Sequence, residues 1–203
     1  MELKSLEKFG PFIILLAAAY ILLFTPAMTD TLMLDPAKFF SGELWRVLTY
    51  QFVHYNYSHL LENLVALLIS VLLAIELQSD FQSYSATYIF SGVLAILPMW
   101  IISPFMALGS STAIYGSFGF LSRASAKFKI KPYVLLAVVT LLTAGSVAYA
   151  AYAGHAGKAA LAQQFFAHIS GLIFGYYFCL LAFAVRERFA ARKMTCLRAL
   201  SAA

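Results

Sequence analysis

The sequence predicts an all-α membrane protein: one bundle of six transmembrane helices, with a short fourth helix and a long outer loop between the first two. Of its 203 residues, 62% are hydrophobic and only 11% are charged, and the mean hydropathy is +0.82. A soluble domain of this size could not bury so much apolar surface. No polar stretch is long enough for a second domain, so residues 1–203 are interpreted as a single membrane domain.

Six apolar segments are expected to form the helices. Their approximate ranges are 9–24, 59–77, 84–102, 111–122, 133–153 and 165–185. The first segment ends at Thr25, and because Lys4 and Lys8 precede it, a signal peptide is a competing interpretation. We favour a retained helix, because Tyr20 interrupts the run and no clear small-x-small cleavage site follows it.

The connection between the first two segments is long, running from Thr25 to about Ser58. It contains Trp45 and Arg46. The connection also contains the pattern Phe39-Phe40-x-x-x-Leu44-Trp45-x-x-Leu48. This pattern indicates an amphipathic helix at the membrane interface, where tryptophan is enriched.

The fourth segment follows the run Gly109-Ser110-Ser111-Thr112 and is too short to cross a membrane. From Ser111 to Leu121 a helix would be about 16 Å long, whereas a bilayer core is about 30 Å thick. Irregular backbone at membrane depth is tolerated only where it is buried in protein or lines a wet cavity. The segment therefore predicts a helix that begins below the membrane surface, with a pair of serines at its N-terminus.

The distribution of Lys and Arg predicts the topology. With the N-terminus inside, eleven of these residues lie on the cytoplasmic side, including the basic tail over residues 186–203, and three lie on the outer side. This asymmetry follows the positive-inside rule. It places both termini in the cytoplasm and Ser111 on the outer side. A prokaryotic plasma (inner) membrane is expected, because no further domain accompanies the six helices.

The net charge of +5 does not indicate nucleic-acid binding. The basic residues gather at the ends of apolar segments, where they set topology and contact anionic membrane lipid. The two cysteines, Cys179 and Cys196, provide neither a disulfide framework nor zinc-ligand spacing. No metal or other cofactor is expected.

Polar residues inside apolar segments are costly and usually mark function. His59 and Asn63 lie four residues apart on one face of the second segment, and His168 lies about one turn inside the sixth. Each alone also fits a structural role, as a hydrogen bond between helices. Together with Ser111 they supply a nucleophile, a base of suitable proton affinity and donors for an oxyanion, at a similar expected depth.

Small residues would let the fourth and sixth segments approach each other closely. The glycines that thin their faces are Gly116, Gly119, Gly171 and Gly175. If these faces meet, Ser111 and His168 come within reach of each other. Tyr115 lies one turn after Ser111, where its ring could pack against the base.

Four signatures in this order resemble those of rhomboid intramembrane serine proteases, and the similarity covers nearly the whole six-helix core. They are Trp45-Arg46, the run Phe52-x-His54-x-x-x-x-His59-Leu60-x-x-Asn63, Gly109-x-Ser111 with Tyr115, and His168-x-x-Gly171-x-x-x-Gly175. The resemblance implies a rhomboid-like bundle that cleaves transmembrane segments of membrane proteins near their outer ends.

The resemblance also implies a role for each residue. Ser111 would be the nucleophile and His168 the general base and acid, without a third acidic member. His59, Asn63 and the Ser111 backbone N–H would hold the oxyanion. Tyr115 would stack beneath His168, and Gly109 would permit the close approach of the loop.

Thr112 departs from the family, which usually has glycine after the nucleophile. A β-branched threonine is bulkier and stiffer than glycine. It would narrow the cavity, alter the preference at the cleavage site or abolish activity, or its hydroxyl would cap the helix or act as an additional donor. A catalytically inactive rhomboid-like protein that binds transmembrane segments is therefore the main alternative function.

Two further alternatives have less support. A small transporter would need acidic or basic residues near the midplane of several helices, whereas Glu62 and Glu76 are the only acids within a segment. The start Gly42-Glu43-Leu44-Trp45-Arg46 also resembles that of rhombosortases, which process C-terminal sorting tails.

Overall fold

Every regular element that the chain forms in its described part is a helix, as the composition predicts. The computed structural model describes residues 3–154 and 157–201, with side chains described from residue 7 to residue 184 apart from Met99 and the gap. Within these ranges the only β-type pairing is an isolated bridge between Leu34 and Ala107. The side chains of the basic tail, including Cys196, lie outside the described residues.

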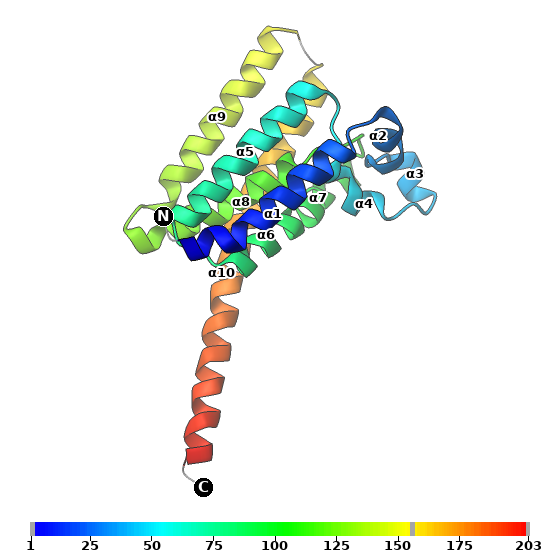
Figure 1. The fold of residues 1–203 in the computed structure, drawn as a ribbon. Coiled ribbons are helices and arrows are strands. Elements are labelled where there is room, and N and C mark those ends of the chain that lie inside the picture. The colour runs from blue at the N-terminus through cyan, green and yellow to red at the C-terminus, as the bar shows by residue number, and fades with distance from the viewer. Residues whose placement is uncertain (1–2, 155–156, 202–203) are drawn as a thin grey trace.

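Five of the six predicted segments each coincide with one helix and the third holds two, although several bounds differ (Figure 1). The helices in these places are α1 (Leu3–Leu22), α5 (Tyr57–Glu76), α6 (Phe81–Leu94) with α7 (Leu97–Ile102), α8 (Ser111–Ala124), α9 (Pro132–Tyr152) and α10 (Lys158–Ser201). The third segment was wrongly predicted as one continuous helix, because the chain breaks between α6 and α7. The sixth begins earlier than expected, and its helix continues through the region predicted as a tail.

The outer loop contains short helices rather than the single amphipathic helix expected from its sequence. These are α2 (Pro26–Leu32), α3 (Pro36–Phe40), α4 (Arg46–Thr49) and the 3₁₀ helix η1 (Tyr50–Phe52). A turn through Gly42, whose φ of +113° suits glycine, separates α3 from α4. Most apolar side chains of the pattern are exposed, as an interfacial position requires, with Phe40 66% and Trp45 50% accessible, whereas Phe39 is partly buried against Trp100.

Arg46 holds this loop together from the inside. It is 2% exposed, and its guanidinium pairs with the Glu43 carboxylate at 2.6 Å. The same guanidinium donates to the carbonyl oxygens of Asp30 at 3.1 Å and Met33 at 2.8 Å. Arg46 therefore joins α2 to α4, whereas Trp45 beside it faces outward.

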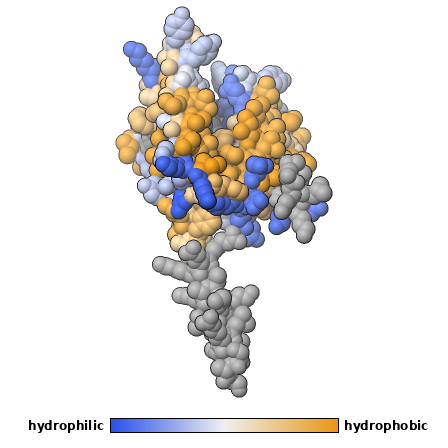
Figure 2. All heavy atoms as spheres, turned by 90° about the vertical axis from the view of Figure 1, so that its left-hand side faces the viewer, coloured by the Kyte–Doolittle hydropathy of each residue, from blue (hydrophilic) through white to orange (hydrophobic). Residues whose placement is uncertain are grey.

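The apolar helices are consistent with an integral membrane protein. Among the described residues, α5, α9 and the Lys158–Ala184 part of α10 are long and apolar enough to cross a bilayer. A fourth span is counted if Glu7–Leu22 and Pro26–Leu32, which bend by 109°, are taken together. Figure 2 shows an apolar band with hydrophilic residues gathered at its two ends. The number of six spans stays a prediction, because α6 and α8 have only 14 residues each.

The short helix α8 lies at the centre of the bundle, in contact with α5, α6, α9 and α10 (Figure 1). Most of its side chains are buried, including Ala113, Ile114, Phe120 and Leu121. It ends in the 3₁₀ helix η2 (Ser125–Phe128). Because its neighbours enclose it, α8 does not need to be long enough to span a membrane, and its N-terminus can begin inside the protein.

Glycines bring α8 and α10 into contact through their backbones. A Cβ atom added at Gly175 would lie 1.8 Å from the Gly116 carbonyl oxygen, and one at Gly119 would lie 2.0 Å from the Leu172 carbonyl oxygen. A Cβ at Gly171 would lie 2.4 Å from the carbonyl oxygen of Thr112. Real side chains never approach so closely, so these helices could not pack in this way with alanine at those positions.

This contact predicts that Gly175→Ala destabilises the protein by at least about 2 kcal/mol, because neither backbone can move freely away from the added methyl group. Thermal unfolding in detergent measures the change. Gly145→Ala on α9 is the matched control, since nothing lies within 4 Å of its added Cβ and no loss of stability is expected. Equal melting temperatures for the two variants would contradict the proposed role of the glycines.

Candidate active site

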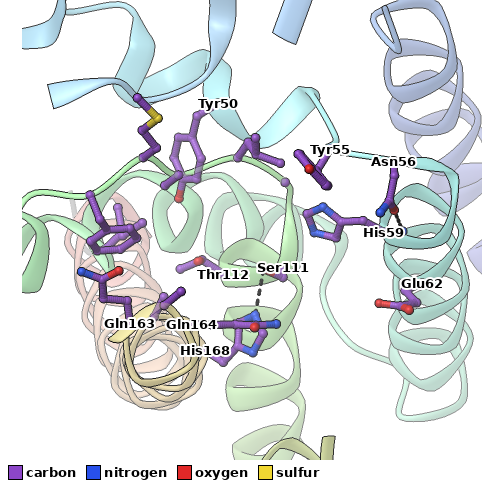
Figure 3. A pocket seen from close by; sticks show the side chains of 18 of the residues that line it. Tyr50, Tyr55, Asn56, His59, Glu62, Ser111, Thr112, Gln163, Gln164 and His168 are labelled. Carbon is purple, nitrogen blue, oxygen red and sulfur yellow. Dashed lines mark hydrogen bonds between the residues drawn. The ribbon is translucent and has the colours of Figure 1, made fainter. Parts of the chain in front are cut away.

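The residues predicted as nucleophile and base lie within hydrogen-bonding distance of each other. Ser111 is the first residue of α8, and His168 lies on α10, 57 positions later. The Ser111 Oγ and His168 Nε2 atoms are 2.9 Å apart (Figure 3). The Nδ1 atom of His168 has no hydrogen-bond partner among the described residues. The arrangement is therefore a serine–histidine pair.

Tyr115 stacks on the imidazole ring of His168, as its spacing from Ser111 suggested. The two ring centroids are 4.2 Å apart, and the planes differ by only 6°. The Tyr115 hydroxyl accepts a hydrogen bond from Thr143 Oγ1 on α9 at 2.8 Å. The ring that supports His168 is thus fixed by a third helix, which sequence spacing alone did not indicate.

The pair opens into a cavity of about 510 Å³. Its walls come from the end of the outer loop, the first turns of α5, the segment preceding α8, and α10 (Figure 3). Polar side chains that line it include Tyr50, Asn56, His59, Glu62, Gln163 and Gln164. A space of this size beside Ser111 can hold a short stretch of extended polypeptide, together with the water that hydrolysis requires.

His59 reaches this cavity because the residue opposite it is glycine. Gly109 has φ of +94°, and a Cβ added there would lie 2.5 Å from His59 Cε1. The Gly109 N–H also donates to the Tyr50 carbonyl oxygen at 3.0 Å. Gly109 therefore has two reasons to be glycine, the backbone conformation and the space for the imidazole ring.

His54 supports His59 from behind. It is 1% exposed, and its ring lies edge-on to the rings of His59 and Tyr20. The distances between the ring centroids are 5.2 Å to His59 and 4.9 Å to Tyr20. Burial, and to a smaller extent the charge of His59, lowers the pKa of His54 to about 3, so this side chain is neutral at physiological pH. His54 acts here as a packed ring and not as a proton carrier.

Asn63 lies next to the site but does not line the cavity. It is 4% exposed, its Nδ2 donates to the His59 carbonyl oxygen at 2.8 Å, and its Oδ1 accepts from Ser110 Oγ at 3.3 Å. Its role as an oxyanion donor stays a prediction. Ser110 is 1% exposed and holds this amide, so the two adjacent serines have different surroundings.

The N-terminus of α8 has no side-chain cap, because Ser110 at the capping position bonds Asn63 instead. The first N–H groups of a helix lack partners within the helix and favour negative charge. At Ser111 they lie beside the cavity, where an oxyanion would form. Thr112 is 3% exposed, lines the cavity and lies against the Tyr50 hydroxyl.

Sequence reasoning missed the contribution of the first turns of α10. The predicted helix began at residue 165, but α10 begins at Lys158 and places Gln163 and Gln164 in the cavity wall. Their position directly before an apolar run was the available signal. Trp45 and Arg46, predicted as supporting residues, do not line the cavity. They belong to the outer loop, which Arg46 stabilises through its hydrogen bonds.

Comparison with known protein families identifies one family for most of the chain. A family model described as the rhomboid domain matches residues 41–185, which are 145 of the 203 residues. The matched range includes every residue of the candidate site. A search among curated proteins finds no significant match.

The stacking of Tyr115 predicts different outcomes for two substitutions. Tyr115→Phe keeps the ring over His168. A fluorophosphonate should therefore label Ser111 of this variant at close to the wild-type rate. Tyr115→Leu removes the aromatic stack and should label about two- to tenfold more slowly, as expected for the loss of one ring pair. If the Phe variant were as slow as the Leu variant, the hydroxyl bond to Thr143 would be the feature that positions His168.

Proposed function

The chain belongs to the rhomboid family, and we propose that it is an intramembrane serine endopeptidase that cleaves transmembrane segments of membrane proteins near their outer ends. The observation that carries this proposal is the 2.9 Å contact between Ser111 Oγ and His168 Nε2 at the wall of a 510 Å³ cavity. Serine is a weak nucleophile unless a base accepts its proton, and neutral imidazole is such a base.

The chemistry would proceed in two steps. Ser111 Oγ attacks the scissile carbonyl carbon while its proton passes to His168 Nε2, and the resulting tetrahedral intermediate collapses when the leaving amine takes that proton. Water then attacks the acyl-enzyme carbonyl and gives a proton to His168; when the bond to Ser111 Oγ breaks, Oγ takes that proton back, and the new carboxyl terminus leaves. Tyr115 would keep the imidazole plane aligned through both transfers.

Stabilisation of the oxyanion is assigned to groups that need no rearrangement. The uncapped N–H groups at the start of α8, including that of Ser111, are preorganised donors. The His59 side chain lines the same cavity. Asn63 is a further candidate that does require a rearrangement: one of its two amide hydrogens bonds the His59 carbonyl oxygen, and its side chain would have to turn for the second hydrogen to reach the cavity.

The substrate we propose is a transmembrane segment that unwinds near its outer end and enters the cavity from the side. An unwound backbone exposes N–H and C=O groups, which are costly in lipid unless they are bonded. Gln163 and Gln164 offer amide donors and acceptors to such a backbone. The proposed orientation has both termini in the cytoplasm of a prokaryotic inner membrane, with membrane lipid around the bundle and the cavity opening outward.

The second candidate is an inactive rhomboid-like protein that binds transmembrane segments, and the buried Thr112 is the feature that favours it. Its side chain lies where the family usually has none, next to the nucleophile. The contact between Ser111 and His168 argues against this alternative, because a protein that only binds would not need the pair to be aligned.

We expect a fluorophosphonate probe to label the purified protein covalently, and Ser111→Ala and His168→Ala to abolish or strongly reduce that labelling. A loss of at least about a thousandfold in rate is typical when one member of such a pair is removed. Ser110→Ala is the matched control for the adjacent hydroxyl. Labelling that survives Ser111→Ala would refute the proposed nucleophile, and a folded wild-type protein that never labels would favour the binding protein.

Thr112 gives a further prediction. If its side chain limits access, Thr112→Gly should raise the turnover of a single-span reporter several-fold, whereas Thr112→Val, which keeps the shape but loses the hydroxyl, should leave turnover unchanged. Reporter cleavage in detergent or liposomes measures both. A drop in turnover for both variants would instead assign a functional role to the threonine hydroxyl.

A further inference from the structure

The cavity beside Ser111 carries one fixed charge, and it is negative. Of the residues that line the cavity, Glu62 on α5 is the only Asp, Glu, Lys or Arg. The remaining polar lining groups are amides, hydroxyls and two imidazoles. Figure 3 shows Glu62 on the cavity side of α5, below His59 along the same helix.

Glu62 has no cationic partner among the described side chains. Its carboxylate accepts a hydrogen bond from Ser58 Oγ, one turn earlier, at 3.1 Å. The ion pair between Arg46 and Glu43 lies in the outer loop and involves no residue that lines the cavity. The carboxylate is therefore available to a positive group that enters the cavity.

The helix itself gives little reason for a carboxylate at this position. An acidic side chain stabilises a helix mainly within the first turn, where it interacts with the helix dipole. α5 begins at Tyr57, so Glu62 lies in the second turn, at an exposed position between Leu61 and Asn63. Its position on the cavity wall is the feature that distinguishes this carboxylate from other exposed ones.

We infer that Glu62 determines substrate specificity by selecting segments that carry a lysine or arginine close to the bond that is cleaved. The inference rests on the proposed protease function and assigns a chemical class of substrate to the same site. Charge complementarity is the reason: in a partly enclosed cavity an opposite charge is attracted, and an acidic substrate residue is repelled. The neutral amides of Gln163 and Gln164 on the opposite wall are compatible with either charge.

The test uses single-span reporter proteins in liposomes. All reporters share the same alanine- and glycine-rich outer segment. They differ in a single Lys, Gln or Glu, which is placed at one position of that segment in each reporter. Ser111 labelling by a fluorophosphonate is measured first and tests the proposed function independently. For the wild type we expect a Lys reporter to be cleaved about tenfold faster than the matched Glu reporter at one or more positions.

Charge substitution of Glu62 then decides the inference. Glu62→Gln should remove the preference between the Lys and Glu reporters, and Glu62→Lys should invert it. Ratios are taken within each variant, so a change in overall rate cancels. Glu76→Gln, on the same helix but outside the cavity, is the matched control and should retain the wild-type ratio.

Failure of this inference can be distinguished from failure of the proposed function. If Ser111 labels and reporters are cleaved, but Glu62→Lys leaves the Lys-to-Glu ratio unchanged, the specificity role is overturned and the protease remains. If Ser111 does not label, capture of the same reporters by photo-crosslinking measures the preference without cleavage. Equal capture of Lys and Glu reporters by the wild type would then overturn the role of Glu62.

Discussion

The candidate site depends on how closely two helix backbones approach each other. Ser111 begins α8 and His168 lies on α10, and their 2.9 Å contact requires that no side chains separate the two helices. Glycine supplies that condition, because an added methyl group at Gly175 would lie 1.8 Å from a carbonyl oxygen of α8. In a bilayer, where apolar side chains gain little by leaving lipid, such close packing is a principal source of association between helices. The packing that stabilises the bundle therefore also sets the geometry of the site.

Polar groups behind the cavity form a second layer that supports the first. The hydroxyls of Tyr20 on α1 and Tyr88 on α6 bond each other and lie close to Ser110. Ser110 in turn holds the Asn63 amide, which bonds the carbonyl oxygen of His59. Buried polar groups are costly unless each has a partner, and in a medium of low polarity such chains of bonds are rigid. The helices far from the nucleophile thus help to fix the residue next to it.

The resemblance to rhomboid proteases predicted the pairing of Ser111 with His168, which lie 57 positions apart, whereas helical spacing placed Tyr115. Tyr115 is one turn from Ser111, and both lie on the face that meets α10, so a period of about 3.6 residues was sufficient. The break between α6 and α7 did have a signal, which the prediction did not use: Pro98 is the second residue of α7, and proline interrupts a helix but fits its first turn. Packing between distant segments determined the remaining features: the Asn63 amide orientation, the Thr143 contact and the early start of α10 at Lys158.

The shortness of α8 has a consequence for how the protein is made. At about 1.5 Å per residue its 14 residues span about 21 Å, so it cannot be inserted as an independent membrane helix. The glycine-containing face of α8 packs on α10, which is synthesised after α9. This contact can therefore form only when α10 has left the ribosome. During synthesis Ser111 therefore enters the membrane before His168 exists, so the proposed protease would stay inert until the bundle around α8 is complete.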